Sequence, residues 1–221
     1  MTKIDIFKAQ FIQILDYCYD AAVNGLPAQE SVFDLAQNYL QEDGTLEEQI
    51  DRLIRNQIAK SAATGFLTGL GGILTLPVAV PADLAATYFI QVRMIGAIAV
   101  MRGYDIHSDQ MKTLIYLALC GDGVREALKD IGVTLGKKLT EAAIKQISGA
   151  TLNKINSAVG FRLLTKAGET GLINFSKGIP LVGGLIGAGV NGYSTDLVGE
   201  AAKKIFSNDA SRTTTAVQTV A

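Results

Sequence analysis

The sequence predicts an all-α fold, a single compact helical bundle, on three observations. Apolar side chains recur with i, i+3, i+4 spacing along almost the whole chain, which is the period of an amphipathic helix. Strand signals, meaning alternating runs rich in β-branched residues between turn pairs, are scarce. Finally, 48% of the 221 residues are hydrophobic, which is enough for one domain to build a full core.

The first 44 residues are rich in acidic side chains and predict two helices. Apolar positions from Ile4 to Asn24 follow one helical stripe, and Gly25-Leu26-Pro27 is expected to end it. A shorter helix is expected over Ser31–Tyr39. The break at Glu42-Asp43-Gly44 separates this acidic part from the rest of the chain.

Helix starts are also recognisable in the rest of the chain. Thr45 and Glu48 have the spacing of a capping box, which predicts a helix running through Ile58. Pro81 suits a first helical turn, and the apolar pattern after it continues to Gly103, so the longest helix is expected there. The later helices are expected, in order, over Ser108 to the Gly121-Asp122-Gly123 turn, from that turn to Asp130, and over Lys137–Ile147, Thr151–Ala167 and Ser194–Phe206.

Two apolar stretches without a charged residue interrupt this pattern, one over Ser61–Ala82 and one over Gly178–Thr195. Both are rich in glycine, and both contain proline, at 77 and 81 in the first and at 180 in the second. A membrane-spanning helix needs about 20 apolar residues without such breaks. We therefore expect two glycine/proline-broken helical elements packed in the core. Filling the core, lining a cavity and inserting in lipid remain open alternatives for them.

The domain organisation expected is one helical domain over residues 1–206, with a family-like core at 45–206, followed by a flexible polar tail at 207–221. Cys18 and Cys120 are far apart and each lies in an apolar helical pattern, which predicts buried thiols in a reducing compartment. The N-terminus lacks the features of a signal peptide. A cytoplasmic location follows as the expectation.

A group of basic residues in the second half of the chain is a candidate for contact with an anionic surface. A nucleic-acid-binding domain is expected to be clearly basic, and with a sequence pI of 5.9 no nucleic-acid partner is expected. The bases either form a solvated helix face or contact an anionic membrane. They are Lys137, Lys138, Lys145, Lys154, Arg162 and Lys166.

The sequence gives little evidence of a catalytic or cofactor-binding motif. Residues 187–192 match G-x-G-x-x-G, but no strand precedes them, so no dinucleotide site is expected. Asp105, His107 and Asp109 are weak candidates for a metal site, since Asp109 also reads as the first-turn acid of a helix. The chain has one histidine and no G-x-S-x-G elbow. We therefore expect no catalytic residue, no metal and no cofactor.

Isolated polar residues near the long predicted helix form a candidate polar seam. Asp83 and Arg93 are single charges beside or within apolar runs, and a buried charge without a partner would cost several kcal/mol. Asp83 either caps the helix that begins near Pro81 or joins Gln91 and Arg93 in the seam.

Four segments carry a resemblance to the EcsC protein family, over roughly residues 45–206. The segments are RNQIAKSAATGFLTGLGGILTLPVAVPADLAATYFIQVRMIGAIAVMRGYD, KTLIYLALCGDG, KINSAVGFRLLTKAG and KGIPLVGGLIGAGVNGYSTDLVG. The resemblance implies a helical bacterial protein, in the cytosol or at the membrane periphery, associated with a membrane system such as an ABC transporter. It implies no reaction and no catalytic residues.

The function expected is that of a non-catalytic, membrane-proximal accessory or partner-binding protein. Its expected partner is an anionic membrane surface or a membrane protein at the inner face of the membrane, and the oligomeric state is left open. One alternative is a protein that handles lipid or another apolar ligand, with hydrolase activity included. Another is a self-assembling module that inserts into membranes.

Overall fold

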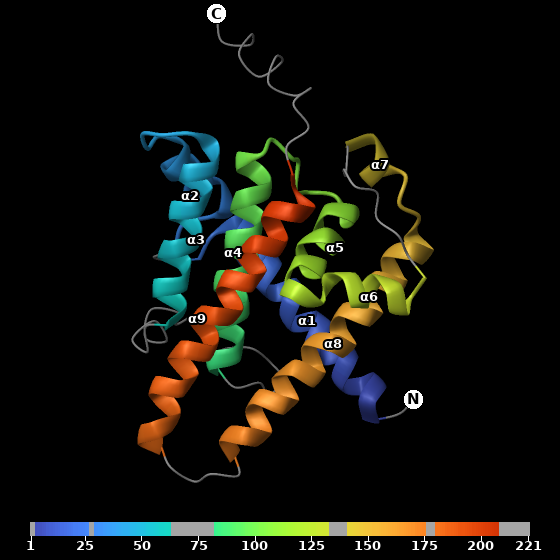
Figure 1. Cartoon of the computed structure of the whole chain (residues 1–221). Helices are drawn as coiled ribbons and strands as arrows, with labels where there is room; N and C mark the ends of the chain where they lie inside the picture. The colour runs from blue at the N-terminus through green and yellow to red at the C-terminus, as the bar shows by residue number, and fades with distance from the viewer. Residues whose placement is uncertain (1–2, 27–28, 63–81, 133–140, 176–179, 208–221) are drawn as a thin grey trace, which may run out of the picture.

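The computed structural model describes residues 3–26, 29–62, 82–132, 141–175 and 180–207, and these form a bundle of helices (Figure 1). Within these ranges there is no strand, and the one β-bridge joins Leu26 and Gln29. The all-α prediction is therefore confirmed. The helices are α1 (Lys3–Asn24), α2 (Val32–Leu40), α3 (Leu46–Ala62), α4 (Ala82–Met101), α5 (Asp109–Ala118), the 3-10 helix η3 (Gly121–Gly123), α6 (Val124–Asp130), α7 (Glu141–Lys145), α8 (Gly149–Phe175) and α9 (Pro180–Ile205).

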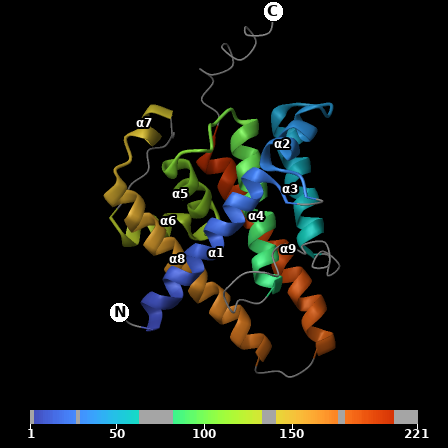
Figure 2. The same ribbon diagram turned by 180° about the vertical axis from the view of Figure 1, so that it is seen from behind.

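Helix α4 is the centre of the bundle. It contacts α1, α2, α3, α5 and α9, and the two opposite views show these helices on different sides of it (Figures 1 and 2). Every described side chain from Ala86 to Ala99 is buried. A helix that is apolar nearly all round is stable only inside a core. The expected helix ending near Gly103 is present, but it is not the longest: α4 has 20 residues, whereas α8 has 27 and α9 has 26. Gly103 has the left-handed φ of 78° that favours glycine after a helix.

Local caps set the starts of α2 and α5. Ser31 accepts a hydrogen bond from the backbone N–H of Asp34, and Asp34 bonds back to the Ser31 N–H. Ser108 caps α5 by accepting from the Met111 N–H. Each side chain satisfies a backbone donor that the first helical turn leaves without a partner.

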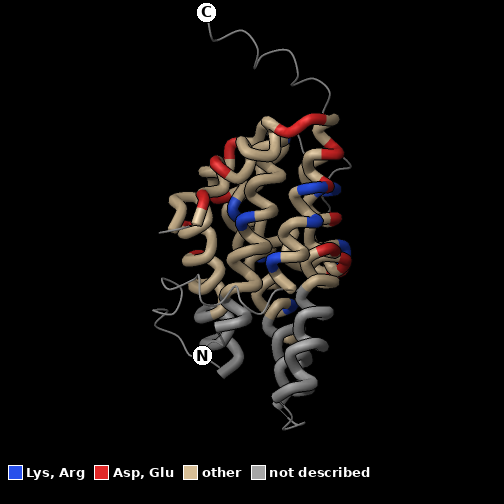
Figure 3. The backbone as a smooth tube through the Cα atoms, turned by 90° about the vertical axis from the view of Figure 1, so that its left-hand side faces the viewer, with Lys and Arg blue, Asp and Glu red and all other residues tan. Residues whose placement is uncertain are grey.

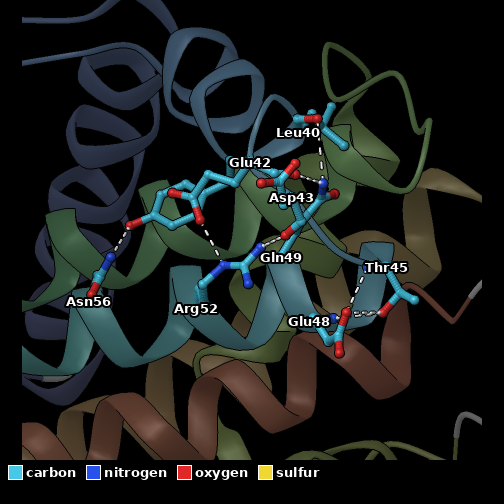
Figure 4. Close-up of polar contacts among 9 residues, drawn as sticks. Leu40, Glu42, Asp43, Thr45, Glu48, Gln49, Arg52 and Asn56 are labelled. Carbon is cyan, nitrogen blue, oxygen red and sulfur yellow. Dashed lines mark hydrogen bonds and ion pairs between the residues drawn. The ribbon is translucent and has the colours of Figure 1, made fainter.

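The turn between α2 and α3 is held by a network of polar contacts (Figure 4). The predicted capping box is present: the Thr45 N–H donates to Glu48 Oε2 at 2.7 Å, and the Glu48 N–H donates to Thr45 Oγ1 at 3.3 Å. Arg52 donates to Glu42 Oε2 at 2.7 Å, and Gln49 Nε2 donates to the Glu42 carbonyl at 2.6 Å. This acidic end of the bundle is thus tied together by side chains from both helices.

Helix α9 corrects one sequence expectation. The stretch Gly178–Thr195 was expected to be broken and followed by a separate helix, but α9 runs without interruption from Pro180 to Ile205. Pro180 is the first helical residue, where the missing N–H costs nothing and the fixed φ suits the helix. The glycines between Pro180 and Thr195 lie within the helix and do not end it.

Glycines of α9 let it approach α3 closely, and α3 and α9 are in extensive contact. A Cβ at Gly199 would lie 2.9 Å from Ile54 Cγ2, and one at Gly192 would lie 3.5 Å from Ile58 Cγ2. The isoleucines of α3 therefore occupy the space that larger residues in α9 would need. This packing brings the polar side chains of α3 and α9 into contact.

The helices on the other side of the bundle differ in length from the prediction. Helix α7, Glu141–Lys145, lies within the helix expected at Lys137–Ile147, whose residues 137–140 are outside the described ranges. Helix α8 continues to Phe175 instead of ending near Ala167. Cys18 and Cys120 are both buried, as expected. The first glycine-rich stretch beyond Ala62 and the expected tail beyond residue 207 lie outside the described residues.

Candidate functional site

Three helices meet in a buried layer of hydroxyl and amide groups. Ser61 at the end of α3 and Thr195 in α9 share a hydrogen bond of 3.0 Å between their hydroxyl oxygens. Gln91 of α4 donates from Nε2 to Thr195 Oγ1 at 3.2 Å and to Ser194 Oγ at 3.0 Å. Thr195 is 0% exposed and Gln91 is 2% exposed. We call Ser61, Gln91, Ser194 and Thr195 the polar layer.

Gln57 lies one turn before Ser61 in α3 and is 0% exposed. Among the described residues, neither its Nε2 nor its Oε1 has a hydrogen-bond partner. A buried amide without partners costs about 1–3 kcal/mol of folding free energy. Buried polar groups in proteins are normally hydrogen-bonded, so an unpaired glutamine amide in an apolar helix interface is unusual.

Arg93 in α4 is buried, with 1% of its surface exposed. Its Nη1 donates to Gln29 Oε1 and to the Glu30 carbonyl oxygen, both at 3.2 Å, and its guanidinium lies 5.5 Å from the centre of the Phe89 ring. Within the described ranges it forms no ion pair, and its Nε has no partner. Burial lowers the pKa of Arg93, while Glu30 and Tyr39 oppose that change.

Lys60 is close enough to Arg93 for the two charges to interact. Partial burial lowers the pKa of Lys60, the positive charge of Arg93 lowers it further, and Glu30 raises it. Two bases therefore share one nearby carboxylate, that of Glu30. The Glu30 carboxylate itself accepts a hydrogen bond from Asn38 Nδ2 at 3.0 Å.

The predicted seam of Asp83, Gln91 and Arg93 is only partly described. Gln91 points to α3 and α9, whereas Arg93 reaches the segment between α1 and α2, so these two side chains do not meet. Asp83 is the second residue of α4, and its side chain lies outside what the structure describes. Gln91 is therefore part of the polar layer, and Arg93 belongs to a second polar group with Lys60.

Two of the three metal candidates, Asp105 and His107, are in contact with each other. His107 Nδ1 lies 2.7 Å from Asp105 Oδ1, and the His107 N–H donates to the same oxygen at 3.1 Å. These hydrogen bonds lower the pKa of Asp105. The His107 ring stacks on Phe33 with 5.5 Å between ring centres, and Asp109 is in the first turn of α5. Across the described part of the chain, no three His, Cys, Asp or Glu side chains are grouped to hold a metal ion.

The basic candidates for an anionic surface do not gather at one point in the part of the chain that is described. Lys145, in α7, is close enough to Asp105 to help lower the pKa of that carboxyl. Arg162 lies 3.8 Å from Glu126 and covers Gly123. Lys154 is exposed on α8. The predicted contacts at Lys137 and Lys138, and the side chain of Lys166, lie outside the described residues.

Acidic residues lie around the α2–α3 turn, at one end of the bundle (Figure 3). The end of α3 and the beginnings of α4 and α9 lie at the same end, opposite the acidic α2–α3 turn (Figure 1). Residues 61–62, 82–92 and 180–195 carry one charge between them, Asp83. We call these three segments the charge-poor end. The last turns of α8, which carry Lys166 and Glu169, run to the same end.

The helices of this end do not form a membrane span. Among the described helices, none combines the length and the apolar character that crossing a bilayer requires. The G-x-G-x-x-G match at 187–192 lies inside α9, so it does not form the turn from strand to helix that a dinucleotide site needs. Tyr193, 66% exposed, is a large aromatic side chain on the surface of α9 at the charge-poor end.

Sequence reasoning missed five of these residues as site candidates: Gln57, Lys60, Ser61, Ser194 and Thr195. Gln57 and Ser61 continue the stripe of Ile50 and Ile54, so two polar residues at buried helical positions were a usable signal. Lys60 directly precedes the apolar stretch, and Thr195 ends the second one. Their contacts with other helices depend on the tertiary fold and have no local signature.

Comparison with known proteins gives one match. A sequence model of the EcsC protein family matches residues 10–208. The match begins within α1, so it includes the N-terminal helices that the resemblance over 45–206 left out. No curated protein sequence and no solved structure matches the chain.

Proposed function

We propose, from the premise that this chain belongs to the EcsC protein family, that it is a non-catalytic accessory protein that docks on an anionic membrane surface by its charge-poor end. The proposed setting is the inner face of a bacterial membrane, where the protein stays peripheral and acts beside a membrane system. The observation that carries the proposal is the near absence of charged residues in segments 61–62, 82–92 and 180–195, at the end opposite the acidic α2–α3 turn.

A surface almost free of charge loses little hydration free energy when it leaves water for the lipid headgroup region. Burying an ionised side chain costs several kcal/mol, whereas burying apolar surface gains about 25 cal/mol per Å². Residues 180–195 of α9 contain no charged residue, so their transfer has a small electrostatic cost, whereas residues 86–92 are buried in the core and do not contribute. Tyr193 is exposed there, and tyrosine is well suited to a membrane interface.

The acidic end supports the same orientation. Glu42, Asp43, Glu47 and Glu48 lie around the α2–α3 turn, at the end away from the proposed membrane contact. Anionic lipids repel such a group within about a Debye length, roughly 8–10 Å at physiological salt. The charge distribution therefore favours one end of the bundle facing the membrane.

Flotation with lipid vesicles tests the proposal. The protein is expected to float with vesicles that contain phosphatidylglycerol and less with phosphatidylcholine alone. Tyr193→Glu, which adds a charge at the charge-poor end, is expected to reduce flotation, and Leu40→Glu is the matched control, because Leu40 is also exposed but ends α2. Protein that stays at the bottom with both vesicles contradicts membrane docking and leaves a membrane-protein partner to be tested. Equal flotation of the two variants contradicts docking by this end.

A further inference from the structure

The buried guanidinium of Arg93 is the least compensated charge among the described residues. It is 1% exposed, has no carboxylate partner there and leaves its Nε unpartnered. By contrast, Arg102, the other buried arginine, pairs with Glu47 at 2.7 Å. A buried cation normally has an anion beside it, because the loss of hydration costs several kcal/mol. Two acceptors and the Phe89 ring offset only part of this cost.

The described contacts of Arg93 leave Nε, on one edge of the guanidinium, buried and without a partner. Both of its hydrogen bonds to Gln29 and Glu30 come from Nη1, whereas no described residue accepts from Nε. Phosphate and carboxylate groups bind arginine with two oxygens across such an edge. An anion could therefore bind without displacing the two acceptors that Nη1 already has.

A second cation lies near the same place. Lys60 is exposed, and its charge and that of Arg93 repel each other across the α3–α4 interface. Glu30 is the nearby carboxylate, and it is shared with Asn38. The local balance is thus two bases against one acid.

The position of this group also brings it near solvent. Arg93 bonds to the backbone of Glu30, which is exposed, and Lys60 is exposed on α3. Lys60 is the last charged residue before the apolar stretch at 61–82, and Arg93 is the first basic residue after it. The two bases therefore lie at the border of the charge-poor end.

We infer that Arg93 and Lys60 form a binding site for a single phosphate group, with Arg93 as the bidentate ligand and Lys60 as the outer charge. The phosphate can belong to a lipid headgroup or be free in solution, since both present at least two anionic or non-bridging oxygens to the two bases. The inference stands on the contacts of Arg93 and is independent of docking by the charge-poor end.

Thermal melting at constant ionic strength tests the site with inorganic phosphate. The wild-type protein is expected to melt at a higher temperature as phosphate replaces chloride, since a ligand that binds only the folded state stabilises it. Arg93→Met is expected to weaken phosphate binding by about 30-fold or more. Without phosphate this variant is expected to be as stable as the wild type or more stable, because a buried charge without an anion has been removed.

Lys60→Gln keeps the test informative if Arg93→Met fails to fold. Lys60 is exposed, so its substitution is expected to spare the fold while it lowers the phosphate effect. Arg55→Gln is the matched control, because Arg55 is exposed on the same helix and its substitution also removes one positive charge. Its response to phosphate is expected to equal that of the wild type.

A vesicle arm separates the two sources of phosphate. If free phosphate has no effect, but binding to phosphatidylglycerol vesicles is lower in Lys60→Gln than in Arg55→Gln, the site binds a lipid headgroup. If free phosphate stabilises the wild type and not the Arg93 and Lys60 variants, the site takes soluble phosphate. The inference is wrong if the wild type responds to neither free phosphate nor phosphatidylglycerol vesicles. It is also wrong if Lys60→Gln and Arg55→Gln respond alike to both of these ligands.

Discussion

Replacing Thr195 by valine tests whether the polar layer contributes to stability. The Thr195 hydroxyl is fully buried and takes part in two hydrogen bonds, to Ser61 at 3.0 Å and from Gln91 at 3.2 Å. Valine has a similar size and helix propensity, so the main change is the loss of these bonds. Gln91 keeps its bond to Ser194, but Ser61 loses this partner.

The expected loss of unfolding free energy is about 1–3 kcal/mol. Each net hydrogen bond contributes about 0.5–1.5 kcal/mol, and a buried group left without a partner costs about 1–3 kcal/mol. For a chain of this size, each kcal/mol lowers the melting temperature by about 2–4 °C. Urea denaturation measures the change directly. Thr165→Val is the control, because Thr165 is exposed on α8, and it is expected to change stability by less than about 0.5 kcal/mol.

A double-mutant cycle that combines Thr195→Val with Ser61→Ala isolates the interaction between these two hydroxyl groups. Residues in contact are expected to show a coupling energy of at least about 0.5 kcal/mol, so the double variant should lose less than the sum of the single losses. A Thr195→Val protein as stable as the wild type, with no coupling to Ser61→Ala, would show that the layer does not hold α3 and α9 together.

Two other regions give predictions that depend on packing and on proton binding. Gly199→Val is expected to destabilise the protein by about 1–3 kcal/mol, because a Cβ there would lie 2.9 Å from Ile54 Cγ2; Gly149→Ala, with open space around it, is the control in the same urea experiment. Burial raises the pKa of Tyr19 from 10.0 to about 12, and its hydroxyl donates to the Ile106 carbonyl. Stability from this group is present below pH 10 and is lost as pH rises towards 12. Circular dichroism should show a shallower alkaline decline for Tyr19→Phe; an unchanged decline contradicts the assignment.

Helix starts could be predicted well because their signals are local. Ser31, Thr45 and Ser108 each bond a backbone N–H three residues later, and this pattern is visible in the sequence alone. Gly25 and Gly103 after α1 and α4 follow the same logic, since both take a left-handed φ of 78°.

Other features depended on which helices meet. Proline and glycine predicted a break at 178–195, but Pro180 opens α9, and the later glycines of the helix, Gly192 and Gly199, pack against α3. Gln91 and Arg93 look alike in sequence, as polar residues in one apolar helix, yet they reach different neighbours because two residues separate them by about 200° around the helix. Tertiary contacts, and not the local pattern, assign each to its polar group.

Hydrogen–deuterium exchange in the presence of phosphatidylglycerol vesicles tests most directly whether the charge-poor end faces the membrane. We expect slower exchange in peptides covering residues 180–195 when vesicles are added, and unchanged exchange around the acidic turn at residues 41–48. Slower exchange at that turn, or no vesicle-dependent change at the charge-poor end under conditions where the protein floats, would contradict it.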